Sequence, residues 1–144
     1  MGAGTAACRE GFPAKDRRVS RQGVTFDTGM LVALERRKQS AWDVYRRLHE
    51  RGTPITVPAA VLGEWWRGRT DWRDAIRLSL RIETLTEVIA LLAGEALAKT
   101  KRATTIDAFV MASAALRGDV VYSADIEDLG RLRAFFPGVR VLSV

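Results

Sequence analysis

The segment from Thr104 to Leu129 constrains the fold more than any other part of this 144-residue chain. Residues Thr104–Leu116 are apolar on nearly all sides, so we expect a helix that is buried around most of its circumference. Gly118 is suited to end that helix, and Asp119–Tyr122 has the character of a short interior strand. This helix and strand therefore belong to the centre of the fold.

Two carboxylates in the same segment do not fit an apolar core. Asp107 lies in the first turn of the helix, where an unpaired carboxylate is costly unless a cation, a hydrogen bond or water satisfies it. Asp125 follows the strand, and Asp128 comes about one helical turn later. We therefore predict an acidic site between the start of the buried helix and the end of the strand.

Short apolar segments alternate with helical patterns through the rest of the chain. Further strands are predicted at 24–26, 54–57, 81–85 and 139–142, and helices at about 30–38, 40–50, 59–68, 71–80, 86–99 and 129–136. Strands separated by helices, without hairpin turns, predict an α/β fold, a three-layer sandwich with a short, mostly parallel central sheet flanked by helices. Ligands of such sheets gather beyond the carboxyl ends of the strands, which is where Asp27 and Asp125 lie.

Composition and charge narrow the class of protein. Hydrophobic residues make up 47% of the chain and charged residues 28%, as in an ordinary globular domain. We expect one folded domain over residues 24–144 and a flexible basic tail over residues 1–23, which lacks apolar periodicity. The net charge of +6 suits a partner with a phosphate backbone.

Several other classes of site and location are excluded or disfavoured. The single cysteine, Cys8, excludes an internal disulfide and a multi-cysteine metal site. His49, the only histidine, is remote in sequence from the acids, so no Ser-His-Asp or Cys-His scheme can be built on it and a surface role is expected. No apolar run is long enough to cross a bilayer and the N-terminus lacks a secretory signal, so we expect no membrane contact and a cytoplasmic location.

Four carboxylates are the candidate site residues: Asp27, Glu64, Asp107 and Asp125. Asp27 and Asp125 could simply cap helices, and Glu64 and Asp107 could be buried acids paired with arginine. Together, two acids at strand ends and two in apolar helix segments would repel one another unless a divalent cation neutralised them.

Four short motifs in this order resemble the PIN domain, and more narrowly the ribonuclease toxins of VapBC toxin–antitoxin pairs. They are VTFDTGML at Val24–Leu31, VLGE at Val61–Glu64, TIDA at Thr105–Ala108 and VYSADIEDL at Val121–Leu129, and the resemblance covers roughly residues 24–142. It implies that Asp27, Glu64, Asp107 and Asp125 form the acidic metal-binding quartet. It also implies that Thr28 and Ser123 are the small hydroxyl positions beside the quartet and that Asp128 is an additional acid.

The resemblance implies a Mg²⁺-dependent endoribonuclease that acts as a toxin, with Mn²⁺ as a possible substitute. Oxygen-only ligands agree, because they select hard cations over zinc. Asp27, Asp107 and Asp125 are expected to be direct or water-bridged ligands, and Glu64 either a ligand or the group that orients the attacking water. The expected partners are RNA, a cognate antitoxin protein and a second copy of the chain in a homodimer.

Two adjacent tryptophans bear on the protein partners. Trp65 and Trp66 cannot face the same way on a helix, so at least one is expected to reach a second surface. The resemblance implies that this surface is the homodimer interface or the groove for an antitoxin segment. Trp65 and Trp66 are therefore the predicted partner-binding residues.

Two other functions stay open. A housekeeping PIN nuclease could process RNA, or cleave DNA, without an antitoxin. A non-catalytic receiver-like signalling domain also places acids at strand ends, but it requires an adjacent acidic pair after the first strand, whereas Thr28 and Gly29 follow Asp27. It also requires a lysine after a late strand, where this chain has Ser123-Ala124-Asp125.

Overall fold

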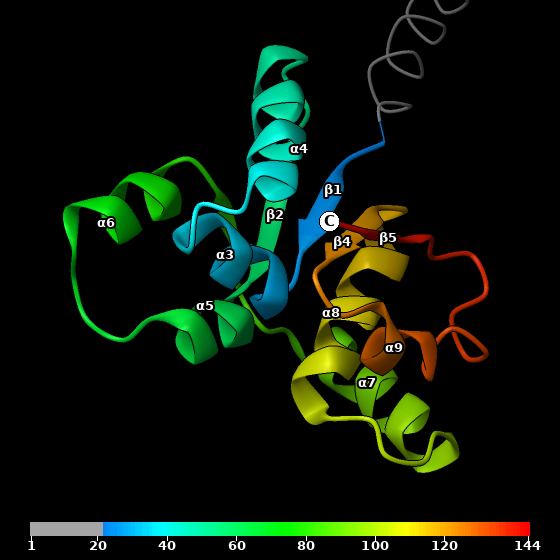
Figure 1. Cartoon of the computed structure of the whole chain (residues 1–144). Helices are drawn as coiled ribbons and strands as arrows, with labels where there is room; N and C mark the ends of the chain where they lie inside the picture. The colour runs from blue at the N-terminus through cyan, green and yellow to red at the C-terminus, as the bar shows by residue number, and fades with distance from the viewer. Residues whose placement is uncertain (1–21) are drawn as a thin grey trace, which may run out of the picture.

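The computed structural model describes residues 22–144, which are built around a five-stranded parallel sheet (Figure 1). The strands are β1 (Val24–Phe26), β2 (Ile55–Pro58), β3 (Arg81–Glu83), β4 (Val120–Ser123) and β5 (Val141–Ser143). The helices are α3 (Thr28–Glu35), α4 (Gln39–Glu50), α5 (Ala59–Trp65), α6 (Asp71–Leu78), α7 (Glu87–Lys99), α8 (Thr105–Arg117) and α9 (Ile126–Gly130). The predicted α/β sandwich is confirmed.

The strand order β3-β2-β1-β4-β5 puts the first strand in the middle of the sheet. Thr25 lies opposite Thr56 of β2 on one side and Val121 of β4 on the other. Because every pair is parallel, the carboxyl ends of β1 and β4 meet at one edge of the sheet. The residues that follow these strands, Asp27 and Asp125, are thereby brought to the same side of the molecule.

Helices cover both faces of the sheet. Helix α8 packs across β1, β2 and β4, with α7 outside it, while α3 and α4 cover the other face (Figure 1). The buried residues of α8 include Val110, Met111 and Ala112, which confirms the helix predicted to be buried around most of its circumference. Gly118 ends it in the left-handed conformation, at φ 75°, as predicted.

A polar network links α8 to β1, to β3 and to Asp119, the residue before β4. The Arg117 guanidinium donates to Asp119 Oδ2 at 2.9 Å, to Thr25 Oγ1 at 2.7 Å, and to the Glu83 carboxylate and Ser113 Oγ. The Thr25 hydroxyl lies 2.8 Å from Asp119 Oδ2 and donates to it. Asp119 is only 5% exposed, so this arginine compensates a buried negative charge.

Some predicted boundaries were wrong. The last helix was expected at 129–136, but α9 spans Ile126–Gly130 because Asp125 caps it, and turns follow it. Helix α5 ends at Trp65 rather than near Gly68, and the Thr70 hydroxyl caps α6 by accepting a hydrogen bond from the Arg73 N–H. The second strand, predicted at 54–57, spans Ile55–Pro58, and Pro58 is also the residue before α5.

Two predictions concern segments and properties outside the sheet. The tail predicted at residues 1–23 lies outside the described residues except for its last two. Within residues 22–144, no helix combines the length and the apolar character needed to span a membrane.

Candidate active site

Asp27 is the fixed centre of the acidic site. It follows β1 and caps α3, with its Oδ1 accepting a hydrogen bond from the Met30 N–H at 2.8 Å. Its Oδ2 accepts a hydrogen bond from the Ser123 hydroxyl at 2.5 Å, across the β1–β4 pair. The side chain is 6% exposed and is held at both oxygens. Asp27 therefore caps a helix, which was one of the two roles considered for it from the sequence. Each of its carboxylate oxygens accepts one hydrogen bond within the described residues and can accept a second bond or bind a cation.

Ser123 and Asp125 form the second part of the site, at the end of β4. The Ser123 Oγ is buried, accepts from the Asp125 N–H at 2.9 Å and donates to Asp27. Asp125 caps α9, with its Oδ1 accepting from the Glu127 N–H at 3.2 Å, and its side chain is exposed. The Ser123 hydroxyl thus links the loop that carries Asp125 to the buried Asp27.

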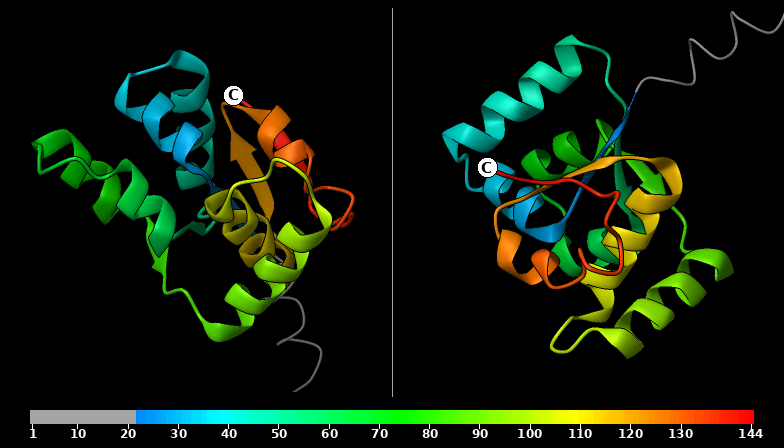
Figure 2. Two further views of the ribbon diagram at one scale, coloured as in Figure 1. Left: turned by 90° about the horizontal axis from the view of Figure 1, so that it is seen from below. Right: turned by 90° about the vertical axis from the view of Figure 1, so that its right-hand side faces the viewer.

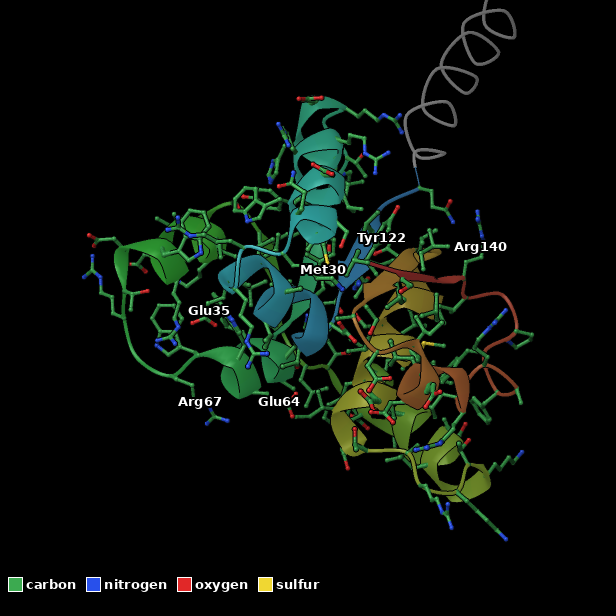
Figure 3. All side chains as sticks on the ribbon, viewed as in Figure 1. Met30, Glu35, Glu64, Arg67, Tyr122 and Arg140 are labelled. Carbon is green, nitrogen blue, oxygen red and sulfur yellow. The ribbon has the colours of Figure 1, made fainter. Side chains whose placement is uncertain are left out.

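Asp107, Glu64 and Asp128 approach the same region from three helices. Asp107 lies half-buried in the first turn of α8, and its N–H donates to the capping hydroxyl of Thr104 at 3.1 Å. Glu64 lies exposed on α5, and Asp128 half-buried on α9. Figure 3 shows Glu64 on α5, which contacts α8, and α8 in turn contacts α9 (Figure 2). The charges of Asp107 and Asp125 act on Asp27, and those of Glu64, Asp125 and Asp128 act on Asp107, so the four predicted acids and Asp128 lie near one another.

The acids disturb one another's ionisation. Burial raises the pKa of Asp27 from 3.8 to about 6, against the opposing effect of the hydrogen bonds from Ser123 and Met30. The negative charges of Asp107 and Asp125 raise the pKa of Asp27 further. Burial likewise raises the pKa of Asp107; the Thr104 hydroxyl opposes this, and the charges of Asp128, Glu64 and Asp125 add to it. The site thus holds excess negative charge.

Within the part of the chain that the structure describes, the buried carboxylate of Asp119, unlike that of Asp27, is neutralised by an arginine. Asp119 and Asp27 are buried to a similar degree, 5% and 6% exposed, but Asp119 forms an ion pair with Arg117 at 2.9 Å. Within residues 22–144, neither Asp27 nor Asp107 forms an ion pair with any lysine or arginine. The alternative that Asp107 is a buried acid paired with an arginine is therefore wrong within residues 22–144.

The site fits a hard cation in its donor chemistry. All the gathered donors are carboxylate or hydroxyl oxygens, which Mg²⁺ and Mn²⁺ prefer. The Thr28 Oγ1, next to Asp27, is buried and has no hydrogen-bond partner within the described residues. An unsatisfied buried hydroxyl beside an acid is a position that a bound water or ion could complete. Within residues 22–144, no group of three or more Asp, Glu, His or Cys side chains lies close enough together to hold a metal ion as the side chains stand.

The two tryptophans lie in different environments. Trp65 is 2% exposed, and its indole N–H donates to Glu35 Oε2 at 2.9 Å. Arg73 binds the same carboxylate at 2.7 Å, so Trp65 is part of a fixed core contact between α3, α5 and α6, near the Glu35 labelled in Figure 3. The predicted partner role of Trp65 does not fit this burial. Trp66 is half-buried, with the Arg77 guanidinium 5.9 Å from the centre of its ring, and its partner role stays a prediction.

Arg131 is a neighbour of the site that the sequence reasoning missed. Its NH1 lies 3.4 Å from Asp128 Oδ1 and donates to the Arg102 carbonyl at 3.2 Å. The spacing of three residues between Asp128 and Arg131 on a helical segment could have indicated the pair. Their contact places a cation at the rim of the acidic site.

The fold and the acidic edge together define a PIN-like α/β domain. Solved structures with a similar chain include VapBC2 from Rickettsia felis bound to a DNA fragment from their promoter, with a TM-score of 0.67, 16% identity and coverage of 84% of this chain and 98% of that one. A chain of the DNA-bound VapBC from Salmonella typhimurium gives a TM-score of 0.65, 15% identity and coverage of 85% and 98%. A chain of a toxin–antitoxin complex from Klebsiella pneumoniae gives a TM-score of 0.63, 20% identity and coverage of 83% and 96%.

These likenesses confirm the predicted PIN-like fold over most of the chain. With identities of 15–20%, they establish the fold alone. No protein-family model matches the chain, and no curated protein matches its sequence.

Proposed function

We propose that this protein is a Mg²⁺-dependent endoribonuclease that acts as the toxin of a type II toxin–antitoxin pair. The observation that carries the proposal is the buried carboxylate of Asp27, which has no cationic partner within residues 22–144 and lies near Asp107 and Asp125. A buried acid surrounded by other acids is costly in a merely structural role. Such a cluster of acids can bind a divalent cation, and the cation can in turn bind an RNA phosphate.

The acids would divide the work according to their mobility. Hydrogen bonds from the Met30 N–H and the Ser123 hydroxyl would hold the Asp27 carboxylate in a fixed position as a ligand. Asp107 would supply a second carboxylate from the first turn of α8. The side chain of Asp125 is exposed and caps α9 with Oδ1, so its Oδ2 would face a cation. Glu64 is exposed and would be either a ligand or the group that orients the attacking water. When bound, Mg²⁺ or Mn²⁺ would lower the pKa of a water and offset the charge on the attacked phosphate.

The remaining polar residues would hold this arrangement in place. Ser123 fixes Asp27 and the Asp125 loop, while the unpaired Thr28 hydroxyl is available to a water beside Asp27. Asp128 adds charge at the rim. Water attack at phosphorus would break the P–O3′ bond and leave a 5′-phosphate and a 3′-hydroxyl.

The toxin role rests on the likeness to chains of VapBC and other toxin–antitoxin complexes. It requires a cognate antitoxin, because an unrestrained ribonuclease would damage its own cell. An arginine of the inhibitor could bind the carboxylates in bidentate fashion and compete with the cation. We further propose that the chain acts in the cytoplasm and forms a homodimer.

Expression in a bacterial host tests this function. The wild-type chain should arrest growth, and Asp27→Asn should relieve the arrest at equal protein level. Glu95→Gln, which removes an exposed carboxylate on α7, is the matched control and should arrest growth like the wild type. Harmless accumulation of folded wild-type protein would contradict the toxin role. RNA cleavage by that same protein would then favour a housekeeping nuclease.

A further inference from the structure

A basic groove lies between the end of α7, the α7–α8 loop and the turns that follow α9, and its Arg131 contacts Asp128 of the acidic site. Its pocket, of about 410 Å³, is lined by Lys99, Thr100, Lys101, Arg131, Ala134 and Phe135. The Lys99 ammonium lies 5.7 Å from the centre of the Phe135 ring. Lysines, an arginine and an aromatic ring around one hollow form a surface suited to a phosphate chain with bases attached.

The groove is joined to the acidic site through Arg131. Its guanidinium contacts both the Arg102 carbonyl, at 3.2 Å, and the carboxylate of Asp128, at 3.4 Å. Figure 1 shows the loop between α7 and α8 running beneath α9 toward the start of α8, which carries Asp107. A strand bound along this loop would therefore reach the acids directly.

The backbone of Arg102, in the loop between α7 and α8, has an uncommon conformation. Only two non-glycine residues within 22–144 have positive φ, Arg37 at 59° and Arg102 at 62°. This conformation is unfavourable for residues with a Cβ, and glycine would relieve it. The Arg37 side chain is used internally, because its guanidinium lies 4.8 Å from the centre of the Trp72 ring.

Arg102 has no comparable internal role. Its side chain is exposed and makes no hydrogen bond or ion pair with any residue in 22–144; only its carbonyl is used, by Arg131. Arg102 follows Lys101 of the groove in sequence, and its carbonyl binds Arg131 of the groove. A positive φ kept at a residue other than glycine supports a functional role for this exposed cation.

We propose that Lys99, Lys101, Arg102 and Arg131 form a binding site for RNA backbone phosphates that guides a single strand into the acidic site. The inference rests on the proposed ribonuclease function and names the surface that this function requires. The acids repel an approaching polyanion, so cations beside them are needed to hold the phosphates near the point of cleavage.

The test is the binding of a fluorescent single-stranded RNA of about ten nucleotides, measured by anisotropy in EDTA so that no cleavage occurs. Arg102→Gly and Lys101→Ala should each weaken binding about fivefold and reduce the slope of log K against log salt by about 0.7. Arg102→Gly should also leave the melting temperature unchanged or raise it, because glycine relieves the positive φ. That combination separates RNA binding from a structural role.

Arg140→Ala is the matched control, since Arg140 is exposed and lies beside β5, away from the α7–α8 loop (Figure 3). It removes the same charge and should change RNA affinity by less than twofold. Unchanged RNA affinity in both groove variants, with a wild type that binds and cleaves RNA, would overturn the inference and leave the ribonuclease function intact. Weakened binding of an acidic peptide without weakened RNA binding would also overturn it. A wild type that neither binds nor cleaves RNA would contradict both proposals.

Discussion

Replacement of Asp27 by asparagine should stabilise the metal-free protein near neutral pH. The folded state raises the pKa of Asp27 to about 6 from an ordinary value of 3.8. A difference of about two pH units corresponds to about 3 kcal/mol of unfolding free energy once the carboxyl is fully ionised in both states. Asparagine removes the charge and keeps the cap to the Met30 N–H, while the Ser123 hydroxyl must rotate to accept from the new amide.

The sign of the pH dependence follows from the direction of the shift. The native state holds the Asp27 proton to higher pH than the unfolded state, so this group lowers stability as pH rises from about 4 to about 6. Allowing for the altered Ser123 bond, we expect Asp27→Asn to be about 1–3 kcal/mol more stable than the wild type at about pH 7.5. The advantage should shrink by about 2 kcal/mol at about pH 4.5.

Urea denaturation in EDTA at these two pH values measures both quantities. Glu95→Gln is the control, because Glu95 is exposed on α7 and forms no ion pair within the described residues. Equal or lower stability of Asp27→Asn at the higher pH would refute the reasoning. An advantage of the same size at both pH values would also refute it, because the gain would then not come from ionisation.

Three further predictions concern the metal, the Arg117 network and the glycines. Mg²⁺ at a hundred times its dissociation constant should stabilise the wild type by about 2.7 kcal/mol in a thermal melt and Asp27→Asn by far less; equal gains would exclude Asp27 as a ligand. Arg117→Met should cost about 3–5 kcal/mol in urea denaturation, because Asp119 would stay buried without a cation, and a cost below about 1 kcal/mol would contradict that role. Gly94→Ala, in the open middle of α7, should stabilise by about 0.5–1 kcal/mol, whereas Gly118→Ala at φ 75° should destabilise by about 1 kcal/mol; melting temperatures that shift in the same direction would contradict the pair.

The sequence predicted the centre of the fold because local pattern and burial agree there. The apolar run in α8, the αL glycine at its end and the strand that follows all carry local signals of their own. The placement of Asp27 followed from its position after a buried strand. Local signals were weaker around α9. The helix was predicted at 129–136 from apolar residues such as Leu129 and Leu132, but the capping side chain of Asp125 starts it at Ile126.

The proximity of the acids depends on the strand order of the sheet, which no local sequence pattern indicates. Glu64 and Asp107 lie on helices far apart in sequence, and they meet because β1 lies between β2 and β4 in a parallel sheet. The burial of Trp65 was unpredictable for a similar reason. Its core contact depends on Glu35 and Arg73, which reach the same carboxylate–indole cluster from two other helices.

RNA cleavage by the purified chain, with and without divalent cation, tests the central claim most directly. We expect a labelled RNA to be cut in Mg²⁺ or Mn²⁺, leaving 5′-phosphate ends, and to stay intact in excess EDTA. Asp107→Asn should lower the rate by a factor of at least about 100 with the fold preserved, since it removes a proposed ligand, whereas Glu95→Gln should keep the wild-type rate. Full activity in EDTA, or an Asp107→Asn variant that cuts at a near wild-type rate, would contradict a metal-dependent site built on these acids.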